Sequence, residues 1–220
     1  MLGYARNECR VTPIGSVAAL TQPTYMIQNP TYIVTDVELD GFGLGVNSML
    51  SFGSVAVSAS GEMLSEFEAN LARLDGAEQD PGVMEFWATE PEAFAATTHA
   101  PEAPATVMPR FVAWVRGLPG DAIFAAHPVM LDGPWIDHYL QCFTEDRLFD
   151  HPRQADRLFK APPLCLMSLA AGTLRRPAFE CNVNTYPPEW LGNHAHTHRA
   201  IDDARGYAHL LVHLTIGQRA

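Results

Sequence analysis

The 220-residue chain has few charged residues, and most of them are acidic. Asp, Glu, Lys and Arg make up 18% of the sequence, against about 25% in an average soluble domain. Lysine occurs once, as Lys160, and the formal net charge is −11. This composition excludes a protein that coats long nucleic acids electrostatically, because such binding depends on many Lys and Arg side chains. It does not exclude an enzyme whose carboxylates hold metal ions, since the ions then supply the positive charge.

Cysteine and long apolar runs are scarce as well. The four cysteines form no CxxC pair and are too sparse for a disulfide framework, which predicts reduced thiols in a cytoplasmic protein. No apolar run approaches the ~18 residues of a membrane span, and the short apolar segment 14–20 follows Glu8 and lacks the form of a signal peptide. With 47% hydrophobic residues, the chain can still bury a substantial core.

The basic residues are unevenly distributed along the chain. Residues 1–100 contain three basic and thirteen acidic residues, whereas residues 147–176 contain six basic and two acidic ones. A GC-rich genome, which favours codons for Ala, Arg and Pro, explains this pattern without any function. The alternative is that guanidinium groups of the basic segment contact phosphates, for which their planar fork is well suited.

Secondary-structure patterns divide the chain into an extension and a domain. Residues 1–29 have no regular apolar period and contain Pro13 and Pro23, so we expect an N-terminal extension followed by one domain over 30–220. Predicted strands cover 31–39, 49–58, 66–71 and 121–127. Predicted helices lie within 81–118 and over about 133–143, 164–174 and 199–214. Strands followed by alternating helices and strands predict a mixed α/β sheet.

Two carboxylates stand on the first predicted strand. Asp36 and Glu38 are two residues apart, so their side chains point to the same face of an otherwise apolar strand. Neighbouring like charges repel, and burying them together is costly unless a divalent cation binds both. A solvated strand end would also accommodate the pair, but the apolar flanks on both sides favour a metal site.

Three further candidates lie at the starts of predicted helices. Asp132 follows the apolar strand 121–127, where capping the helix is its alternative role. His198 precedes Asp203 by five residues, at the start of the final helix. A first-turn carboxylate also favours the helix dipole, so Asp203 has a structural alternative as well. Along the chain the order is Asp-x-Glu, then Asp, then His-x4-Asp.

This pattern resembles the DEDD superfamily of 3′–5′ exonucleases, in its His-containing DEDDh branch. The matching segments are T-D-V-E-L-D-G at 35–41, A-H-P-V-M-L-D at 126–132 and H-R-A-I-D-D-A at 198–204. Three further segments are similar to the small bacterial exoribonucleases of this superfamily: N-S-M-L-S-F-G at 47–53, E-F-W at 85–87 and Thr197. The resemblance covers residues 31–215. It departs from the family pattern at His127 and Leu131, where Asn and an aromatic residue are common.

The resemblance implies a fold, a mechanism and a set of residue roles. The fold is the ribonuclease H-like α/β fold, with a mixed five-stranded sheet flanked by helices. Two Mg²⁺ or Mn²⁺ ions, about 3.5–4 Å apart, are the implied cofactors of phosphodiester hydrolysis. The implied metal ligands are Asp36, Glu38, Asp132 and Asp203, with Asp36 bridging both ions. His198 is the implied base that takes the proton of the attacking water.

The implied substrate is the 3′ end of a single-stranded nucleic acid, which is released as nucleoside 5′-monophosphates. RNA is favoured because the resemblance is closest to exoribonucleases, and homodimerisation is expected on the same ground. A net charge of −11 further favours short single strands over long polymers. A DNA exonuclease and a non-catalytic nucleic-acid-binding protein on the same fold are the alternatives.

Four residues are candidates for nucleotide contacts. Leu50, Ser51 and Phe52 follow the first motif closely enough to line the pocket of the terminal nucleotide. Trp87 is a candidate for stacking on a base, an interaction worth about 1–3 kcal/mol. Core packing is the alternative for Phe52 and Trp87.

The histidines before the last motif offer a competing metal site. His194, His196 and His198 alternate along the chain, so in an extended segment they share a face and would suit a zinc ion. No cysteine lies nearby, and the carboxylates are better ligands for hard cations. The sequence therefore favours His194 and His196 as loop residues, one of them near the scissile phosphate.

Overall fold

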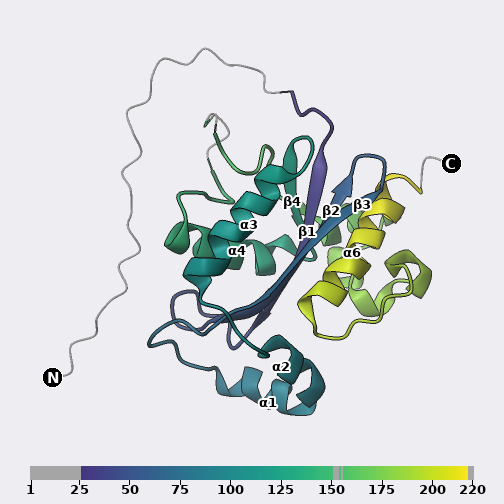
Figure 1. Cartoon of the computed structure of the whole chain (residues 1–220). Coiled ribbons are helices and arrows are strands. Elements are labelled where there is room, and N and C mark those ends of the chain that lie inside the picture. The colour runs from purple at the N-terminus through teal and green to yellow at the C-terminus, as the bar shows by residue number, and fades with distance from the viewer. Residues whose placement is uncertain (1–25, 151–153, 155, 218–220) are drawn as a thin grey trace.

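The computed structural model describes residues 26–150, 154 and 156–217, which form a five-stranded sheet between two layers of helices (Figure 1). The strand order is β3-β2-β1-β4-β5. β1 pairs with β2 in antiparallel and with β4 in parallel orientation, so the predicted mixed five-stranded sheet is confirmed. The strands are β1 Thr31–Leu39, β2 Met49–Ser58, β3 Met63–Asn70, β4 Ala122–Ala126 and β5 Leu164–Cys165.

Helices cover both faces of the sheet. In Figure 1, α3 and α4 lie against one face, α6 lies against the other, and α1 and α2 pack together beyond one end of the strands. The helices are α1 Pro81–Thr89, α2 Pro91–Thr97, α3 Pro104–Gly117, α4 Val129–Phe143, α5 Leu166–Leu174 and α6 Ala200–Thr215. Three short 3₁₀ turns precede α6: η1 Ala178–Glu180, η2 Val183–Thr185 and η3 Pro188–Leu191.

Side chains of β1 alternate between two apolar cores. Ile33 and Val37 are buried in the core beneath α3 and α4, whereas Val34 is buried in the core that includes α5 and α6. Because successive side chains of a strand point to opposite faces, Asp36 and Glu38 share the face of Val34. Both carboxylates of the first motif therefore point toward α6.

The structure moves three element boundaries. α4 begins at Val129, whereas the prediction places its start at about Gly133. Gly133 and Pro134 both have low helix propensity, so the sequence does not indicate that the helix begins before them. β3 begins at Met63 instead of residue 66, since its pairing with β2 extends to Val57. Leu164 and Cys165, predicted as helix, form the short strand β5 beside β4; two residues are too few to show a periodic pattern.

The boundary between extension and domain stays a prediction, because residues 1–25 lie outside the described part. The described end of the segment packs on the turn before β4. The backbone amide of Gln28 donates to Asp121 Oδ2 at 2.7 Å. A Cβ atom on Gly120 would collide with the backbone carbonyl of Asn29. Among the described residues, no helix has the length and apolar character needed to cross a membrane.

Candidate active site

Four carboxylates converge where β1 and β4 end. Asp36 and Glu38 project from β1, and Asp132 lies in the first turn of α4, directly after β4. Parallel strands end at the same edge of a sheet, which brings these three together. Asp203, in the first turn of α6, completes the group from the opposite layer. One ligand oxygen each from Asp36, Glu38 and Asp203 lies within 4.8 Å of the other two.

A glycine allows α6 to approach the sheet closely enough for this meeting. Gly53 of β2 pairs with Asp36 of β1 in the antiparallel ladder. A Cβ atom on Gly53 would lie 2.4 Å from both the Cα and the backbone nitrogen of Ile201, in the first turn of α6. The backbone of α6 therefore rests directly on the strand at the level of Asp36. Glycine is the residue that permits such a contact, because it has no side chain.

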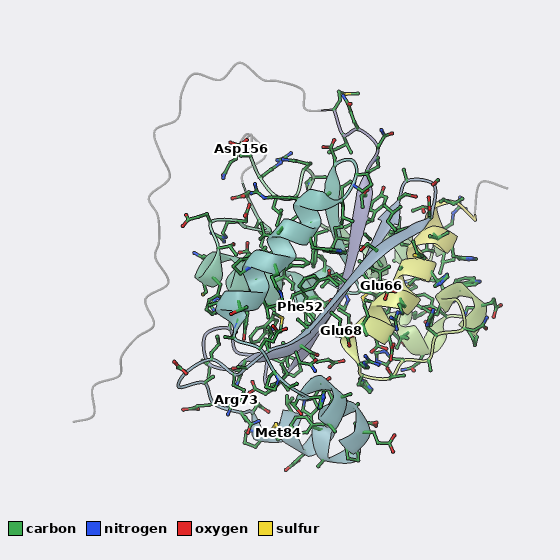
Figure 2. The ribbon with its side chains drawn as sticks, in the orientation of Figure 1. Phe52, Glu66, Glu68, Arg73, Met84 and Asp156 are labelled. Atoms are coloured by element: carbon green, nitrogen blue, oxygen red, sulfur yellow. The ribbon has the colours of Figure 1, made fainter. Side chains whose placement is uncertain are left out.

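Ion pairs between α6 and β3 hold the helix laterally. Arg199 donates to Glu68 at 2.8 Å, and Arg205 donates to Glu66 at 2.7 Å. Figure 2 labels both glutamates on the strand beside α6. These two arginines are the nearest to Asp203 in the sequence, and both are engaged by carboxylates outside the four. Among the residues that the structure describes, no Arg or Lys forms an ion pair with the four site carboxylates.

The environment of the four carboxylates disfavours their charged forms. Burial raises the pKa of Asp36 and of Glu38 well above the usual range, and the neighbouring carboxylates raise both further. Burial also raises the pKa of Asp132 to about 8, although the backbone amide of Val37 lowers it in part. A group of buried acids without cations is costly in its ionised state.

Divalent cations fit this group. Asp132 and Asp203 are 1% and 3% exposed, and each has one carboxylate oxygen, Oδ2, that makes no hydrogen bond within the described chain. Unsatisfied buried oxygens of this kind are unusual in a folded protein. Hard cations such as Mg²⁺ and Mn²⁺ prefer carboxylate oxygens as ligands, and their charge removes the repulsion between the acids. The donor set and its electrostatics therefore both match a divalent metal centre.

His198 stands at the rim of the carboxylate group. It is half-buried and has a positive φ of 55°, a conformation that turns the chain sharply before α6. The edge of its ring packs against Phe86, with the ring centroids 4.9 Å apart. Burial lowers its pKa, and the neighbouring His196 lowers it further. The imidazole is therefore neutral near pH 7 and able to accept a proton.

Sequence reasoning missed the contact between His196 and Asp203. His196 Nδ1 lies 2.8 Å from Asp203 Oδ2, although the geometry is not that of a hydrogen bond. His194 is oriented elsewhere and stacks on His209 of α6, with centroids 5.3 Å apart. The alternation of the three histidines does not separate these two environments, because their surroundings depend on how the loop folds over α6.

His127, which stands where Asn is common in the family pattern, has a hydrogen-bond partner of its own. His127 Nε2 and the hydroxyl of Tyr186 are 2.9 Å apart, and the His127 ring stacks on Tyr207 at 4.8 Å. Burial lowers the pKa of His127 to about 4, so the ring is neutral near pH 7. Tyr207 lies one helical turn after Asp203 and connects this cluster to the carboxylates, which together with burial raise its pKa.

Two of the four candidate nucleotide contacts are aromatic residues, and both are buried. Phe52 packs against Phe67 and Phe111 in the core under α3, and the Trp87 indole donates to the Leu39 carbonyl at 2.9 Å. Trp87 is 2% exposed and Phe52 fully buried, which favours the core alternative for both rings.

Leu50 and Ser51 are also buried, at 2% and 3% exposure. Ser51 pairs with Glu38 across the ladder, so its side chain lies on the same face as Glu38 and beside it. The Ser51 hydroxyl has no hydrogen-bond partner among the described residues. Ser51 is therefore a neighbour of the carboxylate group.

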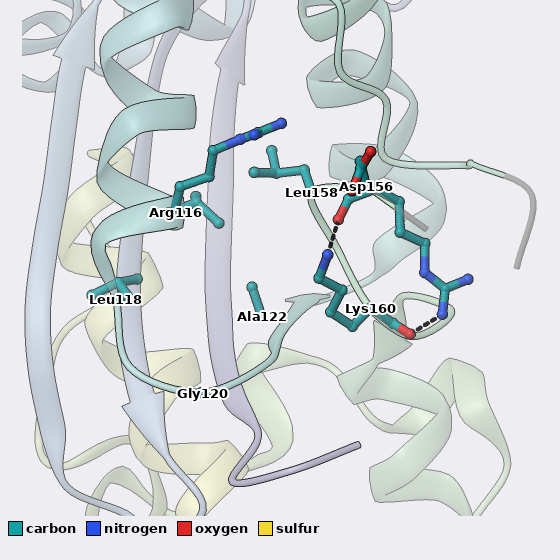
Figure 3. Close-up of a pocket in the computed structure, with 9 residues that line it drawn as sticks. Arg116, Leu118, Gly120, Ala122, Asp156, Leu158 and Lys160 are labelled. Carbon is teal, nitrogen blue, oxygen red and sulfur yellow. Dashed lines mark hydrogen bonds between the residues drawn. The ribbon is translucent and has the colours of Figure 1, made fainter. Parts of the chain in front are cut away.

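Two cavities lie outside the carboxylate group. One, of about 570 Å³, lies beside β3 and α2 and is lined by Glu68, His99 and Arg199, next to His198 in the chain. The other, of about 270 Å³, lies at the amino end of β4, where Figure 3 shows Arg116, Asp156 and Lys160 around it. Arg116 is paired with Asp146 at 2.6 Å there. This second cavity therefore lies at the opposite end of β4 from Asp132.

Comparisons with solved structures identify the fold. The chain superposes on a 3′-exonuclease whose structure is described as showing 3′-end specific recognition of a histone mRNA stem-loop. The TM-score is 0.60 and the identity 9%, and the match covers 87% of this chain and 83% of that one. It also superposes on the nuclease domain of 3′hExo, a DEDDh family member bound to rAMP, with a TM-score of 0.58, 10% identity, and coverage of 87% and 94%. The chain has the fold of the DEDDh exonucleases.

A third structure has the same fold within a longer chain. The zinc-bound complex of E. coli ExoI with single-stranded DNA superposes with a TM-score of 0.57 and 14% identity, over 87% of this chain but 41% of that one. No protein-family model matches the sequence, and no curated protein matches it in sequence. The likeness is therefore one of fold, at identities of 9–14%.

Proposed function

We propose that the protein is a metal-dependent 3′–5′ exonuclease of the DEDDh type. The observation that carries this proposal is the buried group of Asp36, Glu38, Asp132 and Asp203, which lacks Arg or Lys ion pairs within the described residues and has His198 at its rim. A protein that only bound nucleic acid would have no need for four buried acids at one point. The fold shared with 3′-exonucleases supports the same function.

Asp36, Glu38, Asp132 and Asp203 are the residues that would hold the two metal ions, Mg²⁺ or Mn²⁺. When bound, such ions stabilise the charge that develops on the attacking and leaving oxygens of a phosphodiester. The chain's own contribution is to fix the ligand oxygens. The Thr197 amide donates to Asp203 Oδ1 at 2.9 Å, which leaves Oδ2 directed into the site. The backbone amide of Val37 favours the charged form of Asp132, since it lowers the pKa of that carboxyl in part.

His198 would accept the proton of the attacking water at an imidazole nitrogen. Its lowered pKa keeps that nitrogen unprotonated near pH 7, and the edge-on contact with Phe86 restricts the orientation of the ring. A base with a pKa near or below the working pH is available in its reactive form. The product would be a nucleoside 5′-monophosphate.

The substrate would be the 3′ end of a short single-stranded nucleic acid, with RNA preferred to DNA. Support for single strands comes from the net charge of −11, which disfavours long polymers, and from a neighbour described with single-stranded DNA. Support for RNA comes from the exoribonuclease-like segments and from a neighbour described with the 3′ end of an mRNA stem-loop. A cytoplasmic location and a homodimer belong to the same proposal and rest on the sequence.

The test is a cleavage assay on 5′-labelled single-stranded RNA and DNA of identical sequence. The purified protein is incubated with Mg²⁺, Mn²⁺ or EDTA, beside two variants. Asp36→Asn removes a charge from the site without changing the size of the side chain. Asp75→Asn is the matched control, because Asp75 is exposed in a turn and does not belong to the carboxylate group.

We expect a ladder that shortens by one nucleotide at a time from the 3′ end, faster on RNA. EDTA and Asp36→Asn should abolish it, and Asp75→Asn should leave it unchanged. Cleavage that persists in Asp36→Asn would refute the assignment of the site. A folded wild-type protein that cleaves neither strand with either metal, yet binds them, would favour the non-catalytic alternative.

A further inference from the structure

From the side chains around Asp203 we infer a second metal site, formed by His196, His198 and Asp203, that takes a transition-metal ion such as Zn²⁺. Its ligand atoms all lie within 4.8 Å of one another. It shares Asp203 with the carboxylate group but otherwise consists of imidazoles, which places it on the loop side of α6. The inhibitory role of this site rests on the proposed nuclease function.

The geometry around Asp203 points to a missing ligand. Asp203 Oδ2 is buried, makes no hydrogen bond among the described residues, and lies 2.8 Å from His196 Nδ1. The ring centroids of His196 and His198 are 4.4 Å apart, and the ring planes make an angle of 68°. A tetrahedral zinc ion with ligands at about 2.0–2.1 Å holds them about 3.4 Å from one another. Small side-chain rotations bring the three residues to this spacing.

The surroundings fix the shared ligand in place. The Thr197 amide donates to Asp203 Oδ1 at 2.9 Å, so the carboxylate is anchored by the residue between the two histidines. Hydrogen bonds of this kind orient metal ligands and raise their affinity. With three protein ligands, a fourth position is left for water, as in many zinc sites.

The ligand types determine which ion is bound. Imidazole nitrogens bind Zn²⁺ far better than Mg²⁺, whereas the all-oxygen group of Asp36, Glu38 and Asp203 suits Mg²⁺ and Mn²⁺. The two groups share Asp203, so each competes with the other for it. Zinc at the histidine site would engage both Asp203 Oδ2 and His198, the proposed base. Binding of zinc would therefore inhibit a magnesium-dependent reaction.

The binding experiment uses the whole protein without nucleic acid. Co²⁺, whose visible absorption reports a tetrahedral site, is titrated first, and Zn²⁺ is titrated by calorimetry. Three variants are compared: His196→Ala, His194→Ala and Asp36→Asn. His194 belongs to the same loop but stacks on His209, so it is the matched control. Asp36→Asn removes a ligand that only the carboxylate group uses.

We expect one zinc ion per chain, with affinity about 100-fold weaker in His196→Ala, because even the loss of an outer-shell partner costs about 10–100-fold and His196 is a direct ligand. His194→Ala should bind as the wild type does, and Asp36→Asn should lose at most about fivefold, the effect of one nearby charge. Wild-type protein that binds no zinc would overturn the inference, as would unchanged affinity in His196→Ala. A large loss in Asp36→Asn would place the ion in the carboxylate group instead.

Inhibition is then measured in the cleavage assay with Mg²⁺ fixed and Zn²⁺ varied, relative to each variant's own activity without zinc. The half-inhibiting zinc concentration should rise about 100-fold in His196→Ala, in step with affinity, and stay constant in His194→Ala. Zinc binding that depends on His196 in a protein without nuclease activity would refute the proposed function but leave the site. Nuclease activity without such binding would refute the site but leave the function.

Discussion

Raising the pH should weaken the metal-free fold through Asp132. Its pKa is about 8 in the folded protein, against 3.8 for an unperturbed carboxyl group. Between about pH 5 and 7 the folded state therefore holds a proton on Asp132 that the unfolded state has lost, and stability falls as the pH rises. One such proton changes the free energy of unfolding by about 1.4 kcal/mol per pH unit. The loss contributed by Asp132 over these two units is about 3 kcal/mol, which by itself corresponds to roughly 6–12 °C in melting temperature for a domain of this size.

Other groups titrate in the same window, so the comparison is made with a variant. The pKa of His127 is lowered to about 4, which makes stability rise with pH up to the unfolded value of about 6.5 and opposes the effect of Asp132. Burial also raises the pKa of Asp36 and of Glu38, so both carboxyls add to the fall of stability with pH. Asp132→Asn keeps these three groups and removes only the Asp132 carboxyl proton. The two proteins are melted in EDTA at half-unit steps from pH 5 to 7.5, and the slopes of stability against pH are subtracted.

We expect the wild-type slope to be more negative by about 1.4 kcal/mol per pH unit, and the variant to be the more stable protein at pH 7.5. Adding Mg²⁺ at pH 7.5 should raise the melting temperature of the wild type well above that of the metal-free protein, because the ion binds only the folded state. The same addition should have a smaller effect on the variant. Parallel slopes for the two proteins would refute the assignment of a buried, protonated Asp132.

Two further substitutions test how the site is supported. Gly53→Ala forces α6 to move by about 1 Å, since its Cβ would lie 2.4 Å from the Ile201 backbone, and should reduce cleavage about 100-fold with an unchanged circular dichroism spectrum. Gly172→Ala, where the added atom meets open space, is its control, and equal activities would contradict the role of Gly53. Trp87→Phe leaves the Leu39 carbonyl without its donor and should destabilise the fold by about 1–3 kcal/mol with KM unchanged. A raised KM without loss of stability would instead support stacking on a base.

Much of the fold could be predicted from local pattern. The strands at 31–39 and 49–58 and the final helix were predicted within a residue or two, because each is long and has one consistent apolar period. β5 was not predicted, because two residues are too few to show an alternation of apolar and polar side chains. The strand is defined only by its pairing with β4. The start of α4 was misplaced because Gly133 and Pro134 break helices locally, whereas tertiary packing maintains this one.

The sequence by itself determined which candidate metal ligands the chain carries and in which order. Two acids on one strand face, a third after a strand and a His-x4-Asp at a helix start are local facts, set by the alternation of strands and the position of helix ends. Tertiary structure decided what surrounds them. It brought Gly53 beneath Ile201, buried Trp87, and turned His196 rather than His194 toward Asp203. These outcomes depend on contacts between segments far apart in the chain, and such contacts leave no periodic signal in the sequence.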